Sequence, residues 1–171
     1  MSERTCAITF KGNPMTLVGN EVIVGQEAPN FTAIGNDLSE VELSSYKGKV
    51  VILSAVPSLD TPVCDIQTKR FNEEAGKLSD KLVVLTLSMD LPFAQKRWCA
   101  AAEAKNVVTL SDYKQRSFGS AFGLYIKELG LLARAVYVID PSGIVKHAQL
   151  VKEVTEQPDY EAALEAAKAL A

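Results

Sequence analysis

The chain has 171 residues, of which 47% are hydrophobic and 23% charged, and this composition is typical of one globular domain spanning residues 1–171. Its net charge is −3 and it contains no basic stripe, so we expect no nucleic-acid partner. The apolar runs are too short to cross a bilayer and the first residues lack a secretory signal, so we expect a cytoplasmic protein with no membrane partner.

The first half of the sequence predicts a hairpin, a strand and a helix. Residues 5–10 and 15–18 favour two short strands around a turn at residues 11–14. Residues 49–56 are an apolar run typical of a buried central strand. A helix is expected to begin at Pro62, which suits a first helical position, with Thr61 as its N-cap, and to extend to about Leu78.

The second half predicts strands that alternate with helices. A second central strand is expected at residues 82–89, followed by a helix at residues 93–105, a short strand at residues 107–110 and a weak helix at residues 115–122. Residues 133–140 and 143–151 predict two strands joined by a turn, and residues 159–171 a last helix with one apolar face. This order indicates an α/β fold with a mixed sheet covered on both faces.

The three cysteines, Cys6, Cys64 and Cys99, are too few for a disulfide scaffold, and no C-x-x-C motif is present. His147 is the only histidine. Because zinc and iron–sulfur sites need several such soft ligands, we expect no metal and no cofactor. Any chemistry of these cysteines is therefore expected to be redox or nucleophilic.

Cys64 lies in the first turn of the helix predicted from Pro62, where free backbone N–H groups and the helix dipole favour a negative charge. The thiolate is the nucleophilic form of cysteine. Thr61 lies on the same helical face, so its hydroxyl can reach a molecule that approaches the sulfur. Buried cysteines are also common as inert packing, and this position alone does not decide between the two roles.

The wider sequence resembles the peroxiredoxins. The motif Pro57-x-x-x-Thr61-x-x-Cys64 matches their active-site signature, and the residues from Thr61 to Cys64 are similar to the thiol peroxidase branch in particular. Residues 90–99 resemble the resolving-cysteine segment of that branch, and residues 130–135 resemble its arginine strand. The resemblance covers nearly the whole chain.

This resemblance implies a thioredoxin-like fold, in which a mixed central sheet is flanked by helices and preceded by an N-terminal β-hairpin. It also implies a peroxidase that works in two halves. The Cys64 thiolate attacks a hydroperoxide and becomes a sulfenic acid, and Cys99 then condenses with it to a disulfide that thioredoxin reduces. A homodimer is the implied assembly.

The other site residues that the resemblance implies are Thr61 and Arg134 for catalysis and Pro57, Pro62 and Val63 for the substrate pocket. Charge that builds on the departing peroxide oxygen has to be met by donors, and fixed donors contribute roughly 10²–10³ each in rate in other enzymes. Arg134 lies in an apolar stretch, where it is expected either to be buried with partners or to reach water from an edge.

Cys99 belongs to a different predicted helix from Cys64. Because a disulfide needs Cα atoms within roughly 7 Å, we expect one or both helix ends to unwind during each cycle. Gln95 and Ala102, one helical turn away, indicate a partly accessible thiol. Apart from the resemblance, Cys99 beside Trp98 is typical of ordinary helix packing.

Two other functions stay open at this point. A thioredoxin-like dithiol oxidoreductase acting on protein disulfides shares the fold, although it normally carries C-x-x-C. A redox-sensing module would pass its oxidation to a partner protein. Cys6 and His147 are expected to be structural, and Gln67, one turn after Cys64, to support the pocket or a partner surface.

Overall fold

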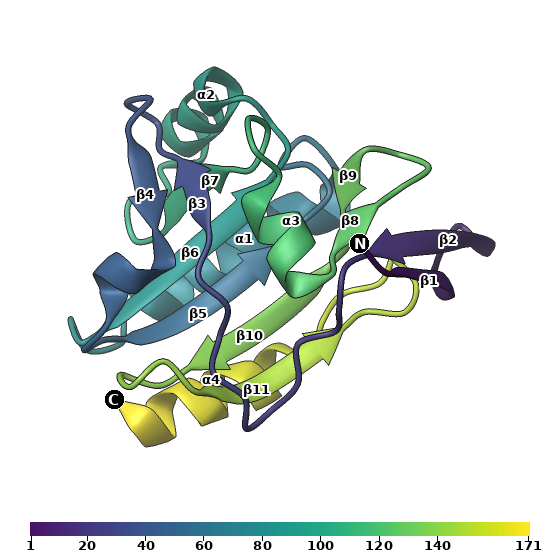
Figure 1. Ribbon diagram of the computed structural model, residues 1–171. Helices are drawn as coiled ribbons and strands as arrows, with labels where there is room; N and C mark the ends of the chain where they lie inside the picture. Colours follow the sequence, from purple (N-terminus) through teal and green to yellow (C-terminus); the bar gives the residue numbers. More distant parts are fainter.

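The computed structural model describes residues 1–171, which form two sheets and four helices (Figure 1). The larger sheet contains β3 (Thr32–Ile34), β4 (Glu40–Glu42), β5 (Val50–Ala55), β6 (Leu82–Ser88), β7 (Val108–Ser111), β10 (Ala135–Ile139) and β11 (Val145–Leu150). The smaller sheet contains β1 (Glu3–Phe10), β2 (Asn13–Val18), β8 (Tyr125–Ile126) and β9 (Leu131–Leu132). The helices are α1 (Pro62–Ala75), α2 (Pro92–Ala102), α3 (Ser117–Phe122) and α4 (Tyr160–Leu170), and a 3₁₀ turn covers Leu43–Tyr46.

The larger sheet is mixed, with the strand order β11-β10-β5-β6-β7-β3-β4. β5, β6 and β7 are parallel, whereas β10 runs antiparallel to both β5 and β11, and β3 runs antiparallel to both β7 and β4. All six residues of β5 are buried, as in a strand that is covered on both faces. The predicted α/β fold with a mixed sheet and a buried central strand is confirmed.

Helices cover both faces of this sheet (Figure 1). On one face, Phe71 of α1 and Leu164 of α4 join the strand residues in one hydrophobic cluster. On the other face, Phe118 of α3 and Leu17 of the smaller sheet join Leu53 of β5 in a second cluster. Burying each large apolar side chain contributes about 1.5–3 kcal/mol, so these two layers fix the sheet between them. No helix has the length and apolar character that a membrane span requires.

The predicted N-terminal hairpin is present, but its turn is shorter than the four residues expected. Phe10 pairs with Asn13, so the turn consists of Lys11 and Gly12 alone and Pro14 belongs to β2. Lys11 and Gly12 have φ of 51° and 80°, and positive φ at both positions matches the twist of a two-residue hairpin turn. Asn-Pro usually marks a loop, but here the tight turn ends before it.

Several other elements differ from the prediction in their bounds or were not expected. The helix that begins at Pro62 ends at Ala75 instead of near Leu78, followed by Gly76. β8 and β9 have only two residues each, too few for an alternating pattern, and were not predicted. Arg134 lies between β9 and β10, so the strand expected from residue 133 begins only after it.

The register of the larger sheet brings distant parts of the chain together. Ala55, at the end of β5, pairs with Ala135 at the start of β10 and with Leu87 near the end of β6. The residues that follow β5 and β6 and the residue that precedes β10 therefore meet at one end of the sheet. This is where Cys64 and Arg134 come together.

Candidate active site

Cys64 is the third residue of α1, which begins directly after the loop that follows β5. Pro62 occupies the first helical position, as predicted, because the N–H it lacks would have no helical partner there. The Cys64 side chain is 0% exposed and packs with Val56 and Leu59. The first turn of a helix favours a negative charge, so a thiolate suits this position.

Arg134 contacts the Cys64 sulfur directly, since its Nη2 donates a hydrogen bond of 3.1 Å to Sγ. The arginine is only 2% exposed, and burial of an unpaired cation would cost several kcal/mol. Here Nε donates to the Val154 carbonyl at 2.8 Å and Nη1 donates to Gln67 Oε1 at 2.9 Å. Of the two expectations for Arg134, burial with partners is the one that the structure shows.

Gln67 is fully buried one turn after Cys64 and orients the guanidinium group. Its Oε1 accepts the hydrogen bond from Arg134, while its Nε2 donates to Ser54 Oγ at 2.7 Å. Because Ser54 belongs to β5, these two hydrogen bonds fix the orientation of the Arg134 side chain relative to the central strand. Of the two roles expected for Gln67, the structure places it beneath the pocket.

Thr61 has the N-cap position and an extended backbone, but its side chain makes no capping hydrogen bond. The predicted N-cap position is therefore confirmed, but the side-chain bond expected of a cap is absent. Its hydroxyl donates instead to the Ser58 carbonyl at 2.9 Å. Because the hydroxyl proton is used in this way, the lone pairs of Thr61 Oγ1 are left to accept a hydrogen bond from a bound molecule.

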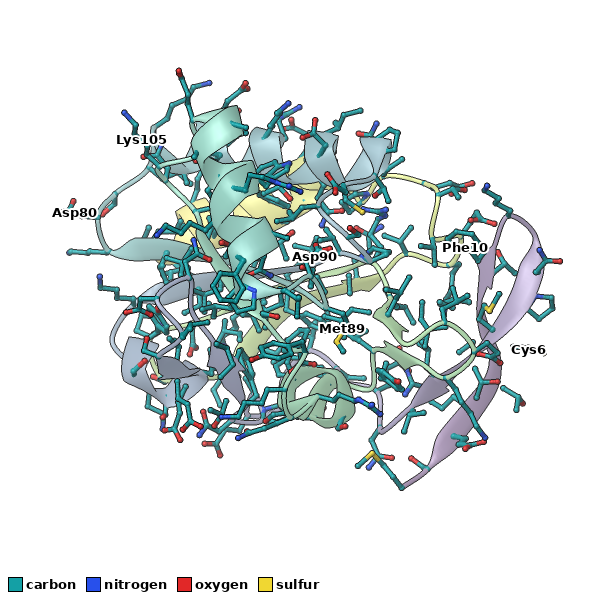
Figure 2. The ribbon with its side chains drawn as sticks, turned by 90° about the horizontal axis from the view of Figure 1, so that it is seen from above. Cys6, Phe10, Asp80, Met89, Asp90 and Lys105 are labelled. Atoms are coloured by element: carbon teal, nitrogen blue, oxygen red, sulfur yellow. The ribbon has the colours of Figure 1, made fainter.

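Asp90 holds the loop before α1 and was not identified as a site residue from the sequence. Its Oδ1 accepts from Ser58 Oγ at 2.7 Å, and its Oδ2 accepts from Leu59 N and Ser88 Oγ, each at 2.8 Å. Figure 2 labels Asp90 in the middle of the molecule, after β6. Ser58 and Leu59 lie 32 and 31 residues away in the sequence, so no local pattern reveals these contacts.

A cavity of about 260 Å³ lies next to Cys64. Its lining includes five of the residues predicted for the site, Pro57, Thr61, Pro62, Val63 and Arg134. It also includes four residues that were not predicted, Phe10, Lys11, Val154 and Thr155. Most of the surface inside the cavity is apolar. Cys64 does not itself line the cavity, but it contacts Arg134, which does.

Cys99 lies in α2, apart from this cavity, and is partly exposed. Its sulfur is 3.4 Å from Thr109 Oγ1 of β7, beside an open groove that Asn36 also lines. Cys64 and Cys99 are both free thiols. The neighbouring Trp98 contacts α1 instead, because its Nε1 donates to Asp65 Oδ1 at 2.9 Å. The two helices are therefore joined through Trp98, and no bond joins the cysteines.

The remaining chemically interesting residues lie elsewhere. Cys6 is exposed on β1 with a φ of 53°, where the register of the hairpin shifts (Figure 2). His147 is half-buried in β11, and burial lowers its pKa. No three His, Cys, Asp or Glu side chains gather closely enough to hold a metal ion.

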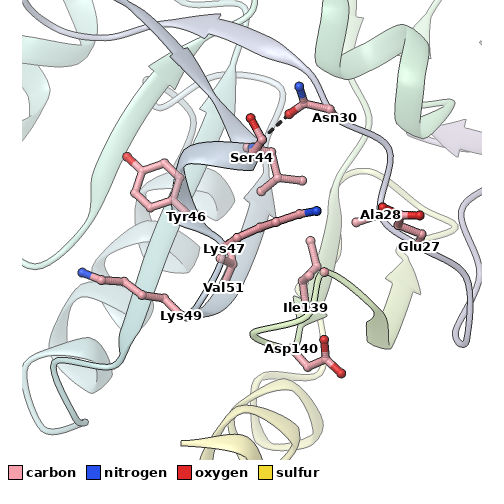
Figure 3. Close-up of a pocket in the computed structure, with 12 residues that line it drawn as sticks. Glu27, Ala28, Asn30, Ser44, Tyr46, Lys47, Lys49, Val51, Ile139 and Asp140 are labelled. Carbon is pink, nitrogen blue, oxygen red and sulfur yellow. Dashed lines mark hydrogen bonds between the residues drawn. The ribbon is translucent and has the colours of Figure 1, made fainter.

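A separate cavity of about 130 Å³ lies near the start of β5, at the other end of that strand from Cys64 (Figure 3). Lys47, Lys49 and Asp140 are among the residues that line it, and they bring charges of both signs. None of the predicted site residues lines this second cavity. Apart from Cys99, which lies beside the groove at Thr109, the predicted site residues therefore gather around the cavity next to Cys64.

The mixed sheet is covered by helices on both faces, and at one end of it a buried cysteine at a helix N terminus contacts a guanidinium group. These features together are typical of the thioredoxin-like thiol enzymes. Comparison with known proteins agrees, because residues 23–164 match the redoxin family. The chain is 61% identical to a thiol peroxidase of Halalkalibacterium halodurans, covering 95% of this chain and 98% of that one. It is 60% identical to a thiol peroxidase of Bacillus subtilis, with coverage of 95% and 97%.

A solved structure extends the comparison to three dimensions. A peroxiredoxin-like protein from Aquifex aeolicus matches with a TM-score of 0.90 and 43% identity over 98% of each chain. The chain therefore belongs to the redoxin family and is a thiol-dependent peroxidase of the peroxiredoxin type.

Proposed function

We propose that this peroxidase reduces hydrogen peroxide and organic hydroperoxides, including alkyl and lipid hydroperoxides, with Cys64 as the peroxidatic residue. The observation that carries the proposal is the 3.1 Å hydrogen bond from Arg134 to the Cys64 sulfur beside the cavity. The thiolate attacks the hydroxyl oxygen of the hydroperoxide, and the O–O bond breaks. The other oxygen takes a proton from solvent and leaves as water or an alcohol. Cys64 is left as a sulfenic acid.

Arg134 and Thr61 act on the peroxide from two directions. The guanidinium stabilises the thiolate and then the charge that develops on the departing oxygen, an effect of roughly 10²–10³ in rate for a fixed donor. Thr61 Oγ1, whose proton is bound to the Ser58 carbonyl, accepts a hydrogen bond from the peroxide hydroxyl. Pro57, Pro62 and Val63 line the cavity and limit the access of water to the reacting atoms.

Cys99 is the resolving residue in this proposal. Its thiol attacks the sulfur of the Cys64 sulfenic acid, a disulfide forms and water leaves. Thioredoxin then reduces the disulfide by thiol–disulfide exchange. Cys64 is buried, and Cys99 contacts Thr109 on the strand side of α2, so an end of α1 or α2 has to unwind before the sulfurs meet. Superimposable backbones around both cysteines in reduced and oxidised crystals would contradict this step.

The setting of the reaction forms part of the proposal. Residues 1–171 act as one thioredoxin-like domain, which is supported by a hydrophobic cluster shared between the two sheets. The enzyme works in the cytoplasm, where thioredoxin and free thiols are kept reduced. It works as a homodimer. This part of the proposal rests on the family alone, and sedimentation of the reduced protein tests it.

Stopped-flow measurement of Trp98 fluorescence tests the cysteine roles. Reduced wild type mixed with a small excess of cumene hydroperoxide is expected to give a fast change, and Cys64→Ser is expected to give none. Cys99→Ser is expected to accumulate a sulfenic acid, detected by trapping and mass spectrometry. Cys6→Ser, which changes the exposed thiol outside the site, is the matched control and should behave as wild type.

A wild type that reacts no faster than a free thiol would show that the catalytic assignment is wrong. If Cys64 then forms mixed disulfides with proteins, a dithiol oxidoreductase or a redox-sensing module becomes the better function.

A further inference from the structure

Glu153 lies between β11 and α4, next to the turn of the N-terminal hairpin. Its Oε1 accepts hydrogen bonds from Gly12 N at 2.8 Å and Thr9 Oγ1 at 3.0 Å. Its Oε2 accepts from Thr155 N at 2.9 Å and Thr155 Oγ1 at 2.8 Å. The backbone N–H groups of Thr155 and Gly12 are the main reason that the pKa of Glu153 is lowered to about 2, so the group is ionised at neutral pH. One carboxylate therefore joins the turn to the segment before α4.

The end of the hairpin has few other polar contacts with the rest of the chain. As far as Thr9, the backbone of β1 is bonded to the same segment, through Lys152 O at 2.7 Å and Val154 N at 2.9 Å. Beyond Thr9, Phe10 and Asn13 pair with each other, and the hydrogen bond from Gly12 N to Glu153 joins the turn to the segment before α4. Phe10 also packs against the larger hydrophobic cluster, so we expect loss of this bond to loosen the turn at Lys11 and Gly12 and to shift the Phe10 ring without removing that packing.

The same turn forms part of the cavity beside Cys64. Phe10 and Lys11 line the cavity on the hairpin side, and Figure 2 labels Phe10 on the hairpin. Thr61 and Arg134 line it close to the sulfur. A hydroperoxide whose O–O bond lies between Thr61 and Arg134 can therefore extend its organic group toward Phe10.

We propose that Glu153 is a positioning residue that holds Phe10 and Lys11 as the outer wall of the cavity, and that this wall favours bulky organic hydroperoxides over hydrogen peroxide. The inference rests on the proposed function of the Cys64 site. Hydrogen peroxide occupies only the space at the reacting atoms and gains little from the wall. An aromatic or long alkyl group instead buries apolar surface against the Phe10 ring and the aliphatic part of Lys11.

The substitution Glu153→Gln tests this role because an amide has one acceptor oxygen and a donor group, and cannot satisfy donors on both sides. We expect the ratio of kcat/KM for cumene hydroperoxide to that for hydrogen peroxide to fall about fivefold to tenfold. Phe10→Ala should lower the ratio similarly. The double variant should add little to either single change, since both act on the same wall.

Glu128→Gln is the matched control. Glu128 also binds the hairpin through its carboxylate, with both oxygens accepting from Thr16 N at 3.0 and 2.9 Å, but it does not line the cavity. The peroxide ratio of this variant should equal that of wild type. A general loss of hairpin stability would lower the ratio in both glutamate variants and would overturn the proposal.

Hydrogen exchange gives a readout that does not depend on activity. The Gly12 amide should exchange faster in Glu153→Gln than in wild type or Glu128→Gln. An unchanged exchange rate, an equal loss for both peroxides, or additive effects in the double variant would each overturn the inference. A wild type that reduces neither peroxide contradicts the proposed function as well. A wild type that reduces both, with a ratio that Glu153→Gln does not alter, contradicts this inference alone.

Discussion

Cys64 and Cys99 are two thiols of one chain in opposite surroundings. The Cys64 side chain is completely buried, and its sulfur accepts a hydrogen bond from a guanidinium group whose other hydrogen bonds go to Val154 and Gln67. Cys99 is partly exposed beside an open groove, and its sulfur has a single polar contact, 3.4 Å from the Thr109 hydroxyl.

The difference matches the demands of the two half-reactions. Attack on a peroxide gains from charges that are already fixed where the transition state needs them, because no reorganisation is then required. Formation of the disulfide instead requires one sulfur to travel to the other. A thiol with few contacts in a partly exposed helix can do this at a small cost in local unfolding.

The largest effect is expected from Arg134→Met, which removes the cation that contacts the Cys64 sulfur. We expect kcat/KM for hydrogen peroxide to fall roughly 10²–10³-fold in stopped-flow measurements, because a fixed donor to the reacting atoms is lost. Arg116→Met is a matched control, since Arg116 lies over the Tyr125 ring and outside the cavity. A folded Arg134→Met protein with the wild-type rate would contradict the role of the guanidinium.

The next largest effect is expected on the pH dependence of the free energy of unfolding, and it comes from Asp112. This residue follows β7, the strand that Cys99 contacts. It accepts hydrogen bonds from Phe118 N and Gly119 N, and burial raises its pKa to about 6. The folded state then binds more protons than the unfolded chain between about pH 4 and 6, so the free energy of unfolding falls as the pH rises through that range.

The size of this effect follows from the raised pKa of Asp112. Relative to Asp112→Asn, which does not titrate, wild type should lose up to about 3 kcal/mol of stability between pH 4 and pH 7. Denaturant titrations of both proteins at several pH values measure the difference. A difference that does not vary with pH would show that Asp112 ionises as it does in water.

A smaller effect is expected at Thr61. Thr61→Val keeps the shape of the side chain but removes the oxygen that receives the peroxide hydroxyl, and about 1.5 kcal/mol of lost hydrogen bonding corresponds to a rate roughly tenfold lower. Thr61→Ser retains the oxygen and should lose much less. The comparison is made with kcat/KM for hydrogen peroxide, and equal losses in the two variants would assign the effect to packing.

The smallest effect is expected at the contact between the two cysteine-bearing helices. Asp65→Ala removes the acceptor for the Trp98 indole N–H, so α2 should separate from α1 more easily. A net hydrogen bond of about 1 kcal/mol corresponds to disulfide formation roughly fivefold faster after a pulse of peroxide. Lys69→Ala removes only the exposed ion pair to Asp65 and should leave this rate unchanged. A slower rate in Asp65→Ala would show that the contact guides the cysteines together.

Several features of the fold were predictable because they depend on neighbouring residues. The burial of β5 and the start of α1 at Pro62 follow from an apolar run and from the preference of proline for a first helical position. The turn at Lys11 and Gly12 was predicted too long, because it depends on which residues of β1 and β2 pair. Thr61 occupies its predicted N-cap position, but its side chain does not cap the helix, and its hydroxyl donates to the Ser58 carbonyl.

Sequence by itself thus determined the fold class, the helix start that carries Cys64 and the motif by which the chain resembles the peroxiredoxins. Only the tertiary structure decided which groups surround the sulfur. Arg134 contacts Cys64 across 70 residues, and Glu153 contacts Gly12 across 141 residues. Such contacts depend on the strand register at the end of β5 and on the docking of the hairpin, and local propensity contains no information about either.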